Sequence, residues 1–358
     1  MRGSGPDRGV LLAATELFTQ RSRHDVEEKR IFLELACNLL PSTSLQDRRR
    51  IATLLAGHPE IPEDLLGALA GDPDELTAYP ALRYSPGLSV DLLLRTAVAG
   101  PDSLRKAIAN RPSLRESVIG ALCDHAGANV IGILLDRDDV TLTPDHRARL
   151  GRRSDIVATL GLELAGRDAL NPDGLMGQFL HLPNQLKARA IAAAEMTSLV
   201  KQAQAPGSGS QVRARPPRRK LCDGLHREAL RQDATRFADL LSQGLGLPLE
   251  TCELLLRQDQ GDGLTIALKA LGMSARQVTA VLIRLCPGLS LDHLRGLLRL
   301  YRTLGMGAAE VLVDQWMLQD QGTQPRHETQ FQDTGRRGGI ASAAKLPESV
   351  PLGKTAGS

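Results

Sequence analysis

Three copies of one short pattern decide the fold: HPEIPEDLLGALA at residues 58–70, SPGLSVDLLLRTA at 85–97 and RPSLRESVIGALC at 111–123. Their prolines, Pro59, Pro86 and Pro112, lie 27 and 26 residues apart. Apolar residues follow each proline at the second, sixth and seventh positions, and a small residue follows at the eleventh. Because these positions share one face of an α-helix, each copy predicts a proline-led turn and then an amphipathic helix.

A second, weaker helical segment follows each copy. It contains Leu76 after the first copy and Leu104 after the second, and a degenerate version runs from Val130 to Leu135. A pair of short helices cannot bury its apolar face alone and has to stack on a neighbouring pair. The repeats therefore predict an all-α fold, a HEAT-like or leucine-rich-variant-like helical repeat (α-solenoid), whose apolar positions Leu65, Leu92 and Val118 face the interior.

Helical periodicity continues on both sides of the repeats. Apolar spacing predicts helices at 10–19, 25–40 and 45–55, and a closing helix at 183–200. Between 136 and 155 the pattern breaks into a polar loop and a short helix that starts near Pro144. In the last third of the chain, SARQ at 274–277 matches a capping box ahead of another apolar stretch.

Length and composition predict two helical domains. A chain of 358 residues exceeds one typical domain, and its aromatic content of 3% requires cores built from Leu, Ala, Val and Ile. The boundaries that we expect are a disordered N-terminus (1–9), a helical-repeat domain (10–200), a basic linker rich in Gly, Ser and Pro (201–220), a second, smaller helical domain (221–320) and a disordered tail (321–358).

The five cysteines lie far apart, without a CxxC pair, so we interpret them as small core residues in a reducing compartment. The apolar run near the N-terminus is too short for a signal peptide, and nowhere do about 18 apolar residues run together. A cytoplasmic protein is therefore expected.

The net charge of +3 is unevenly distributed. Residues 1–200 carry −3 and residues 201–358 carry +6, and Lys201 to Lys220 alone holds six basic residues and no acidic one. This run could contact phosphates or anionic headgroups, although no aromatic residue is interleaved for base stacking, and a solubilising linker is the first interpretation. The candidate anion-contacting residues are Arg213, Arg215, Arg218, Arg219 and Lys220.

No catalytic or metal-binding motif is evident. The eight histidines are scattered, without HExxH or His/Cys ligand spacing. The acidic segment around Asp138 lacks the glycine and closing glutamate of a calcium loop, and GKT at 353–355 lacks the first P-loop glycine. There is no GxSxG elbow. We therefore assign no catalytic residue, no metal and no cofactor.

Three stretches resemble a known bacterial family: ELF at 16–18, ALAGDPDELTAYPALRYSPGLSVDLL at 68–93 and AIANRPSLRESVIGAL at 107–122. They are similar to the bacterial domain of unknown function 2336, over about Leu11 to Ala194 and more loosely from Phe237 to Leu312. This family has no established activity. The resemblance therefore implies a helical fold and transfers no catalytic residue.

The function that we expect is a non-catalytic protein-protein interaction scaffold, because stacked helix pairs present an extended surface. Polar residues near the helix starts, which differ between the copies, are the candidate partner-binding surface: Glu63, Asp64, Asp91, Arg95, Arg115 and Glu116. The alternatives are nucleic-acid or anionic-surface binding through the linker, which the −3 charge of residues 1–200 disfavours, and an enzyme whose site residues are distant in sequence.

Overall fold

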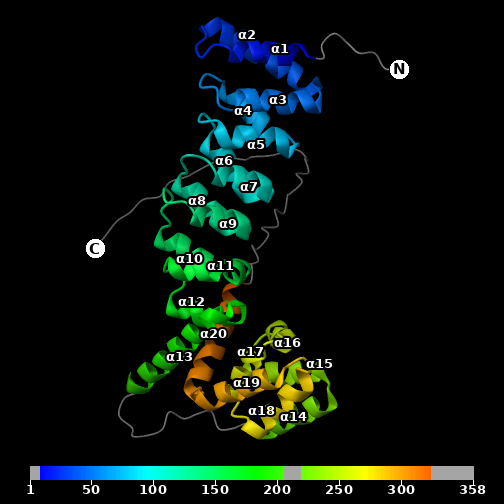
Figure 1. Ribbon diagram of the computed structural model, residues 1–358, viewed down its shortest axis with the longest axis vertical. Helices are drawn as coiled ribbons and strands as arrows, with labels where there is room; N and C mark the ends of the chain where they lie inside the picture. The colour runs from blue at the N-terminus through cyan, green and yellow to red at the C-terminus, as the bar shows by residue number, and fades with distance from the viewer. Residues whose placement is uncertain (1–8, 205–218, 324–358) are drawn as a thin grey trace, which may run out of the picture. The chain divides into compact units, whose positions relative to one another are not determined.

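The structure, a computed structural model, describes residues 9–204 and 219–323 (Figure 1). These residues form twenty α-helices, two short 3-10 helices and the turns between them, with no strand in either described range. The expectation of an all-α chain is confirmed. Most of the expected disordered N-terminus (1–9), basic linker (201–220) and disordered tail (321–358) lies outside the described residues, which omit 1–8, 205–218 and 324–358. Residues 321–323, which we expected in the tail, instead end a helix.

The first part of the chain consists of short helices joined by tight turns. In chain order they are α1 (Val10–Thr19), α2 (Val26–Leu39), η1 (Leu40–Ser42), α3 (Leu45–Leu55), α4 (Glu63–Ala70), α5 (Glu75–Tyr84), α6 (Val90–Ala99), α7 (Asp102–Ala109), α8 (Glu116–His125), α9 (Ala128–Leu135), α10 (Pro144–Arg152), α11 (Ser154–Gly166), α12 (Pro172–Gly177) and η2 (Phe179–His181).

Local sequence explains where many of these helices begin. The Asp25 carboxylate accepts from the backbone N–H of Glu28, and the Glu28 side chain accepts from Asp25, which is a capping box at the start of α2. Ser44 and Asp74 cap α3 and α5 in the same way, through one backbone N–H each. The side-chain oxygens satisfy backbone donors that a helix leaves without an internal partner.

The helices α1 to α11 pack in two rows (Figure 1). One row contains α1, α3, α5, α7, α9 and α11, each in contact with the next of the row. The other row contains α2, α4, α6, α8 and α10, with contacts from α2 to α4 and from α6 through α8 to α10. Helices of the two rows also contact each other; α4, for example, packs against α5.

The repeat positions lie where their periodicity predicts. Leu65 and Val118 are fully buried, and Leu92 is half-buried against the core. Ala70, Ala97 and Cys123, the small residues of the three copies, are buried as well. Small side chains suit these positions because they let neighbouring helices approach closely.

The break that the sequence predicts at 136–155 does not interrupt the packing. Helix α10 packs against α8, and α11 packs against α9, so both rows continue past Asp136. The connection from 136 to 143 is polar, but Leu150, Ile156 and Val157 are buried beyond it. The sequence analysis missed this continuation because α10 carries one apolar core residue, Leu150, in place of the repeated leucine pattern.

The remaining helices lie between residues 184 and 323. They are α13 (Asn184–Gln204), α14 (Arg219–Arg231), α15 (Ala234–Leu245), α16 (Leu249–Arg257), α17 (Asp262–Ala270), α18 (Ala275–Leu285), α19 (Leu291–Thr303) and α20 (Met306–Thr323). Both ends of the expected linker are therefore helical, since α13 continues to Gln204 and α14 begins at Arg219.

Helix α20 packs back on the first part of the chain. Trp316, the single tryptophan, is 2% exposed, and its indole N–H donates to the carbonyl of Met176 at 3.1 Å. Its ring lies 5.9 Å from the ring of Phe179. The described residues up to Gly322 belong to one compact unit.

Candidate interaction surface

Five of the six residues that we expected to contact a partner lie at or near the starts of α4, α6 and α8, and Arg95 lies in the middle of α6. Glu63 and Asp64 are in the first turn of α4, Asp91 is in the first turn of α6, and Glu116 begins α8. All six, including Arg95 and Arg115, are exposed, and none forms an ion pair with another described residue. Their charges are therefore directed to solvent.

Arg219 and Lys220, two of the five candidate anion-contacting residues, are exposed in the first turn of α14. Arg213, Arg215 and Arg218 lie outside the described residues. Anion binding by the linker stays a prediction.

A series of side chains that the sequence analysis missed joins successive helices of each row. In the row of odd-numbered helices, Ser85 follows α5 and donates to the carbonyl of Ala56 at the end of α3, at 2.9 Å. Arg111 follows α7 and donates to the carbonyls of Leu82 and Ser85 at the end of α5. The donors that follow α5 and α7 thus cap the helix before each of them in the row, where unpaired carbonyls and the helix dipole favour a cation.

Arg137 repeats this contact one layer further on. It follows α9, and its guanidinium donates to the carbonyls of Ala109 at 2.5 Å and Arg111 at 2.6 Å, at the end of α7. Asp139 pairs with the same guanidinium, and Arg137 lowers the pKa of that carboxyl. Asp139, which belongs to the segment that partly resembles a calcium loop, therefore orients a capping arginine.

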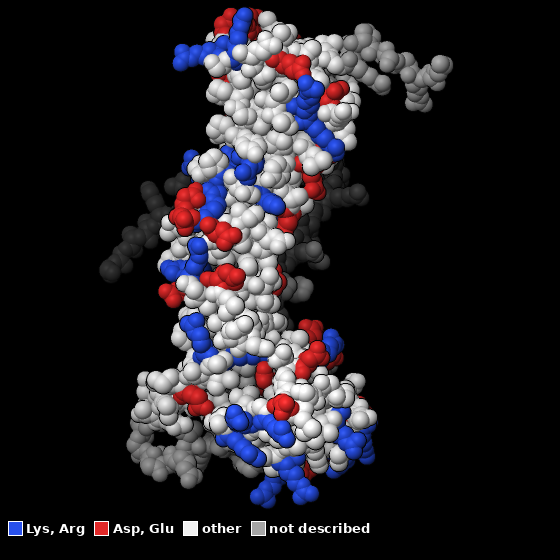
Figure 2. All heavy atoms as spheres, in the orientation of Figure 1, with Lys and Arg blue, Asp and Glu red and all other residues white. Residues whose placement is uncertain are grey.

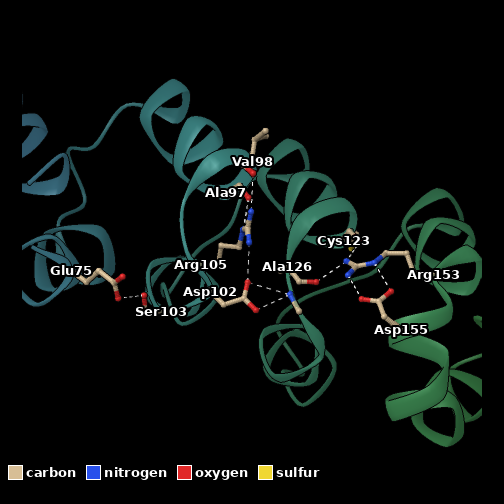
Figure 3. Close-up of polar contacts among 11 residues, drawn as sticks. Glu75, Ala97, Val98, Asp102, Ser103, Arg105, Cys123, Ala126, Arg153 and Asp155 are labelled. Carbon is tan, nitrogen blue, oxygen red and sulfur yellow. Dashed lines mark hydrogen bonds and ion pairs between the residues drawn. The ribbon is translucent and has the colours of Figure 1, made fainter. Parts of the chain in front are cut away.

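The second row has the same contacts. Arg153 follows α10 and donates to the carbonyls of Cys123 at 3.0 Å and Ala126 at 2.6 Å, while Asp155 pairs with its guanidinium (Figure 3). Gln178 follows α12 and donates to the carbonyl of Arg152 at 2.9 Å. We refer to Ser85, Arg111, Arg137, Arg153 and Gln178 as the capping series.

The starts of neighbouring helices are also linked. Asp102 accepts from the backbone N–H of Gly127 at 3.1 Å, and Ser103 hydrogen-bonds to Glu75 (Figure 3). These contacts join α7 to α9 and α7 to α5, so polar contacts fix both ends of the helices in this row.

One signal in the sequence could have revealed the capping series. Arg111 directly precedes the proline of the third copy, and Arg137 follows it by 26 residues, the spacing of the repeat. The cation therefore recurs with the repeat. The sequence alone does not show that its target is a carbonyl of the preceding helix.

The cysteines lie mostly in the helical core. Four of them are buried, and burial raises the pKa of the Cys123 thiol to about 12. Cys37 is exposed, so our interpretation of all five as core residues is wrong at this position, where α2 is uncovered.

No cluster of three or more His, Cys, Asp or Glu side chains suited to a metal ion occurs in residues 9–204 and 219–323. A polar cavity of about 380 Å³ lies among α10, α12 and α20. Arg147, Arg152, Asp168 and Asp173 are among its lining residues, but no histidine or cysteine is.

An apolar groove of about 400 Å³ lies between α1 and α2. The rings of Phe18 and Phe32 stack in it with centroids 4.1 Å apart, and the ring of His24 stacks on Phe18 at 3.8 Å. Leu17 and Ile31 lie exposed at its rims. This groove lies at one end of the two rows. Among the described helices, α3 packs against α1 and α4 packs against α2, so the groove is covered on that side only.

These features define a class of protein: an all-helical chain whose helix pairs stack in two rows, with unpaired charges along one row and an apolar groove at one end. Residues 77–314 match the family described as an uncharacterised protein conserved in bacteria (DUF2336), and the chain belongs to this family. The similarity noted in the sequence is thereby confirmed, and the match continues through the last third of the chain. No curated protein and no solved structure matches it.

No helix in the described part of the chain has the length and apolar character needed to cross a bilayer.

Proposed function

We propose that this chain is a HEAT-like α-solenoid that acts as a non-catalytic scaffold and binds another protein along the row that contains α4, α6 and α8. The observation that carries this proposal is the packing of the helices in two rows, in which the capping series joins several successive helices. Such stacks present extended surfaces on which side chains recur at regular distances.

The exposed charges support the proposal. Glu63, Asp64, Asp91, Arg95, Arg115 and Glu116 have no ion-pair partner among the described residues, whereas Arg49, Arg137 and Arg153 nearby are paired. Charges that are free in the isolated chain can pair across an interface, where they contribute to orientation and association rate. The groove between α1 and α2 adds an apolar region of the kind that receives helices and peptides.

The test is a comparison of affinity captures from a bacterial lysate with three versions of the chain. The wild type is compared with a variant in which Glu63, Asp64, Asp91 and Glu116 are changed to Lys and Arg95 and Arg115 to Glu. The control carries Lys106→Glu and Glu163→Lys, at exposed positions of α7 and α11 in the other row.

We expect one partner to bind the wild type and the control and to be at least about tenfold depleted with the six-site variant, since interfacial charge reversals cost several kcal/mol together. Circular dichroism is used to check that all three chains fold alike. If every protein captured by the wild type is captured equally by the six-site variant, this surface is not the binding site.

A further inference from the structure

The outer face of α19 carries a stripe of arginines that neither the repeats nor the linker accounts for. Leu291, Arg295, Arg299 and Arg302 are spaced by four, four and three residues, so they share one side of the helix. All four are exposed. Leu297, on the opposite side, is buried and packs into the core.

Helix α18, which packs beside α19, extends this face. Its inner side buries Val278, Val281 and Leu282. Arg276 and Ile283, which are seven residues apart and hence on one side, are exposed, as is Arg284. Figure 2 shows Lys and Arg side chains gathered over the part of the surface where Figure 1 has α18 and α19. We call Arg276, Ile283, Arg284, Leu291, Arg295, Arg299 and Arg302 the α18–α19 face.

Carboxylates neutralise little of this charge. Asp292 pairs with Arg295 at 2.9 Å, and both side chains are largely exposed. Asp223 of neighbouring α14 accepts from Gln277 of α18 and not from an arginine of the face. The other four arginines of the face form no ion pair with any carboxylate in the described residues, in contrast to Arg231, Arg236 and Arg257 on other helices.

Two large apolar side chains lie among these arginines. Ile283 is 56% exposed and Leu291 is 71% exposed. Cations that surround exposed aliphatic side chains suit the headgroup layer of an anionic bilayer, where phosphates pair with arginine and aliphatic groups leave water. Aliphatic side chains gain little from a nucleic-acid backbone.

The only Phe, Tyr or Trp side chain of α19 is not available to stack on a base. Tyr301 is half-buried, its hydroxyl donates to the carbonyl of Met273, and the ammonium of Lys269 lies over its ring at 4.3 Å. Single-stranded nucleic-acid sites normally use exposed aromatic rings for stacking. The α18–α19 face therefore lacks the exposed Phe, Tyr or Trp ring that such a site normally uses.

We infer that the α18–α19 face docks on the surface of an anionic lipid bilayer, with its arginines on lipid phosphates and with Ile283 and Leu291 in the headgroup layer. The full chain would then carry a membrane-surface contact separate from the row proposed to bind a protein. Because the attraction is largely electrostatic, the association weakens as salt rises.

The test is co-sedimentation of the full chain with vesicles of phosphatidylcholine alone, or of phosphatidylcholine with phosphatidylglycerol. The first variant is Arg299→Glu with Arg302→Glu. Its matched control, Arg236→Glu with Arg257→Glu, makes the same change in net charge at exposed arginines of α15 and α16. The second variant is Ile283→Ser with Leu291→Ser. A gel shift with single-stranded and duplex DNA is run in parallel.

We expect the wild type and the control to sediment with anionic vesicles and not with neutral ones. The α19 charge reversal should reduce the partition coefficient at least about tenfold, and the serine variant should reduce it several-fold. The inference is overturned if the wild type does not bind anionic vesicles, or if the control loses vesicle binding as strongly as the α19 variant. It is also overturned if the serine variant binds vesicles like the wild type. Binding to DNA that requires the same arginines, without binding to vesicles, would overturn it as well.

Discussion

At the residue scale, Arg111 is the buried arginine of the capping series and donates to two carbonyls at the end of α5. Its side chain is 7% exposed, and burial lowers the pKa of its guanidinium, so the charge is held in a partly desolvated position by the two carbonyls at the end of α5. Arg111→Met removes these donors and leaves buried acceptors without partners. We expect the free energy of unfolding to fall by about 3 kcal/mol, as measured by urea denaturation.

The control for Arg111 is Arg95→Met, at an exposed arginine without an ion pair. It should change the free energy of unfolding by less than about 0.5 kcal/mol. Equal effects of the two substitutions would mean that the capping contact does not stabilise the stack.

Asp74 predicts a pH dependence at the same scale. Its carboxylate caps α5 through Thr77 and pairs with Arg49 at 2.7 Å, and Arg49 holds the pKa of Asp74 well below its usual range. Since the folded-state pKa is depressed, this stabilisation is present above the unfolded pKa of about 4 and is lost as the pH falls toward the folded value. Asp74→Asn should therefore lower the melting temperature at pH 7 and have a diminishing effect below about pH 4.

The comparison for this carboxylate is Asp64→Asn, an exposed residue without an ion pair. Its effect on the melting temperature should be small at both pH values. If the difference between wild type and Asp74→Asn does not shrink in acid, the pairing with Arg49 is not its source.

At the element scale, the sequence predicts where the helices begin and end better than it predicts which helices pack against each other. The boundaries of α1, α3 and the three repeat helices follow from apolar spacing, prolines and caps, which are local signals. The continuation of both rows depends instead on the packing of α10 against α8 and of α11 against α9. No local sequence pattern encodes contacts between helices. For the same reason the groove between α1 and α2 was not predicted, although Phe18 and Phe32 are evident in the sequence.

Glycines test the packing of α10 directly. A Cβ added at Gly151 would lie 2.8 Å from the carbonyl oxygen of Ala169, whereas one added at Gly67 of α4 meets nothing within 4 Å. Gly151→Ala should therefore destabilise the chain by about 1 to 3 kcal/mol, because backbone has to move. Gly67→Ala should stabilise it by about 0.5 to 1 kcal/mol through helix propensity.

Thermal or urea unfolding of the two glycine variants distinguishes their effects. A Gly151→Ala chain as stable as the wild type would contradict the close approach of α10 to the turn before α12.

At the scale of the whole molecule, the chain has two helical segments, α1 to α13 and α14 to α20. The sequence predicts separate domains because a basic stretch divides them. Yet Lys187 of α13 pairs with Asp262 of α17, Glu195 accepts from the backbone N–H of Gly305, and Trp316 is buried against Phe179. Contacts on several helices link the segments, so we expect them to unfold together.

Trp316→Ala tests this expectation because the indole has partners in the first segment. Removing a buried tryptophan leaves a cavity and unpairs the carbonyl of Met176, so the loss should be about 3 to 5 kcal/mol. If the segments form one cooperative unit, urea titration followed by far-ultraviolet circular dichroism will show the whole helical signal shifted to lower urea. Leu318→Ala, at a residue of the same helix that is 59% exposed, should leave the transition almost unchanged. A shift of only part of the signal would show instead that the two segments unfold as separate domains.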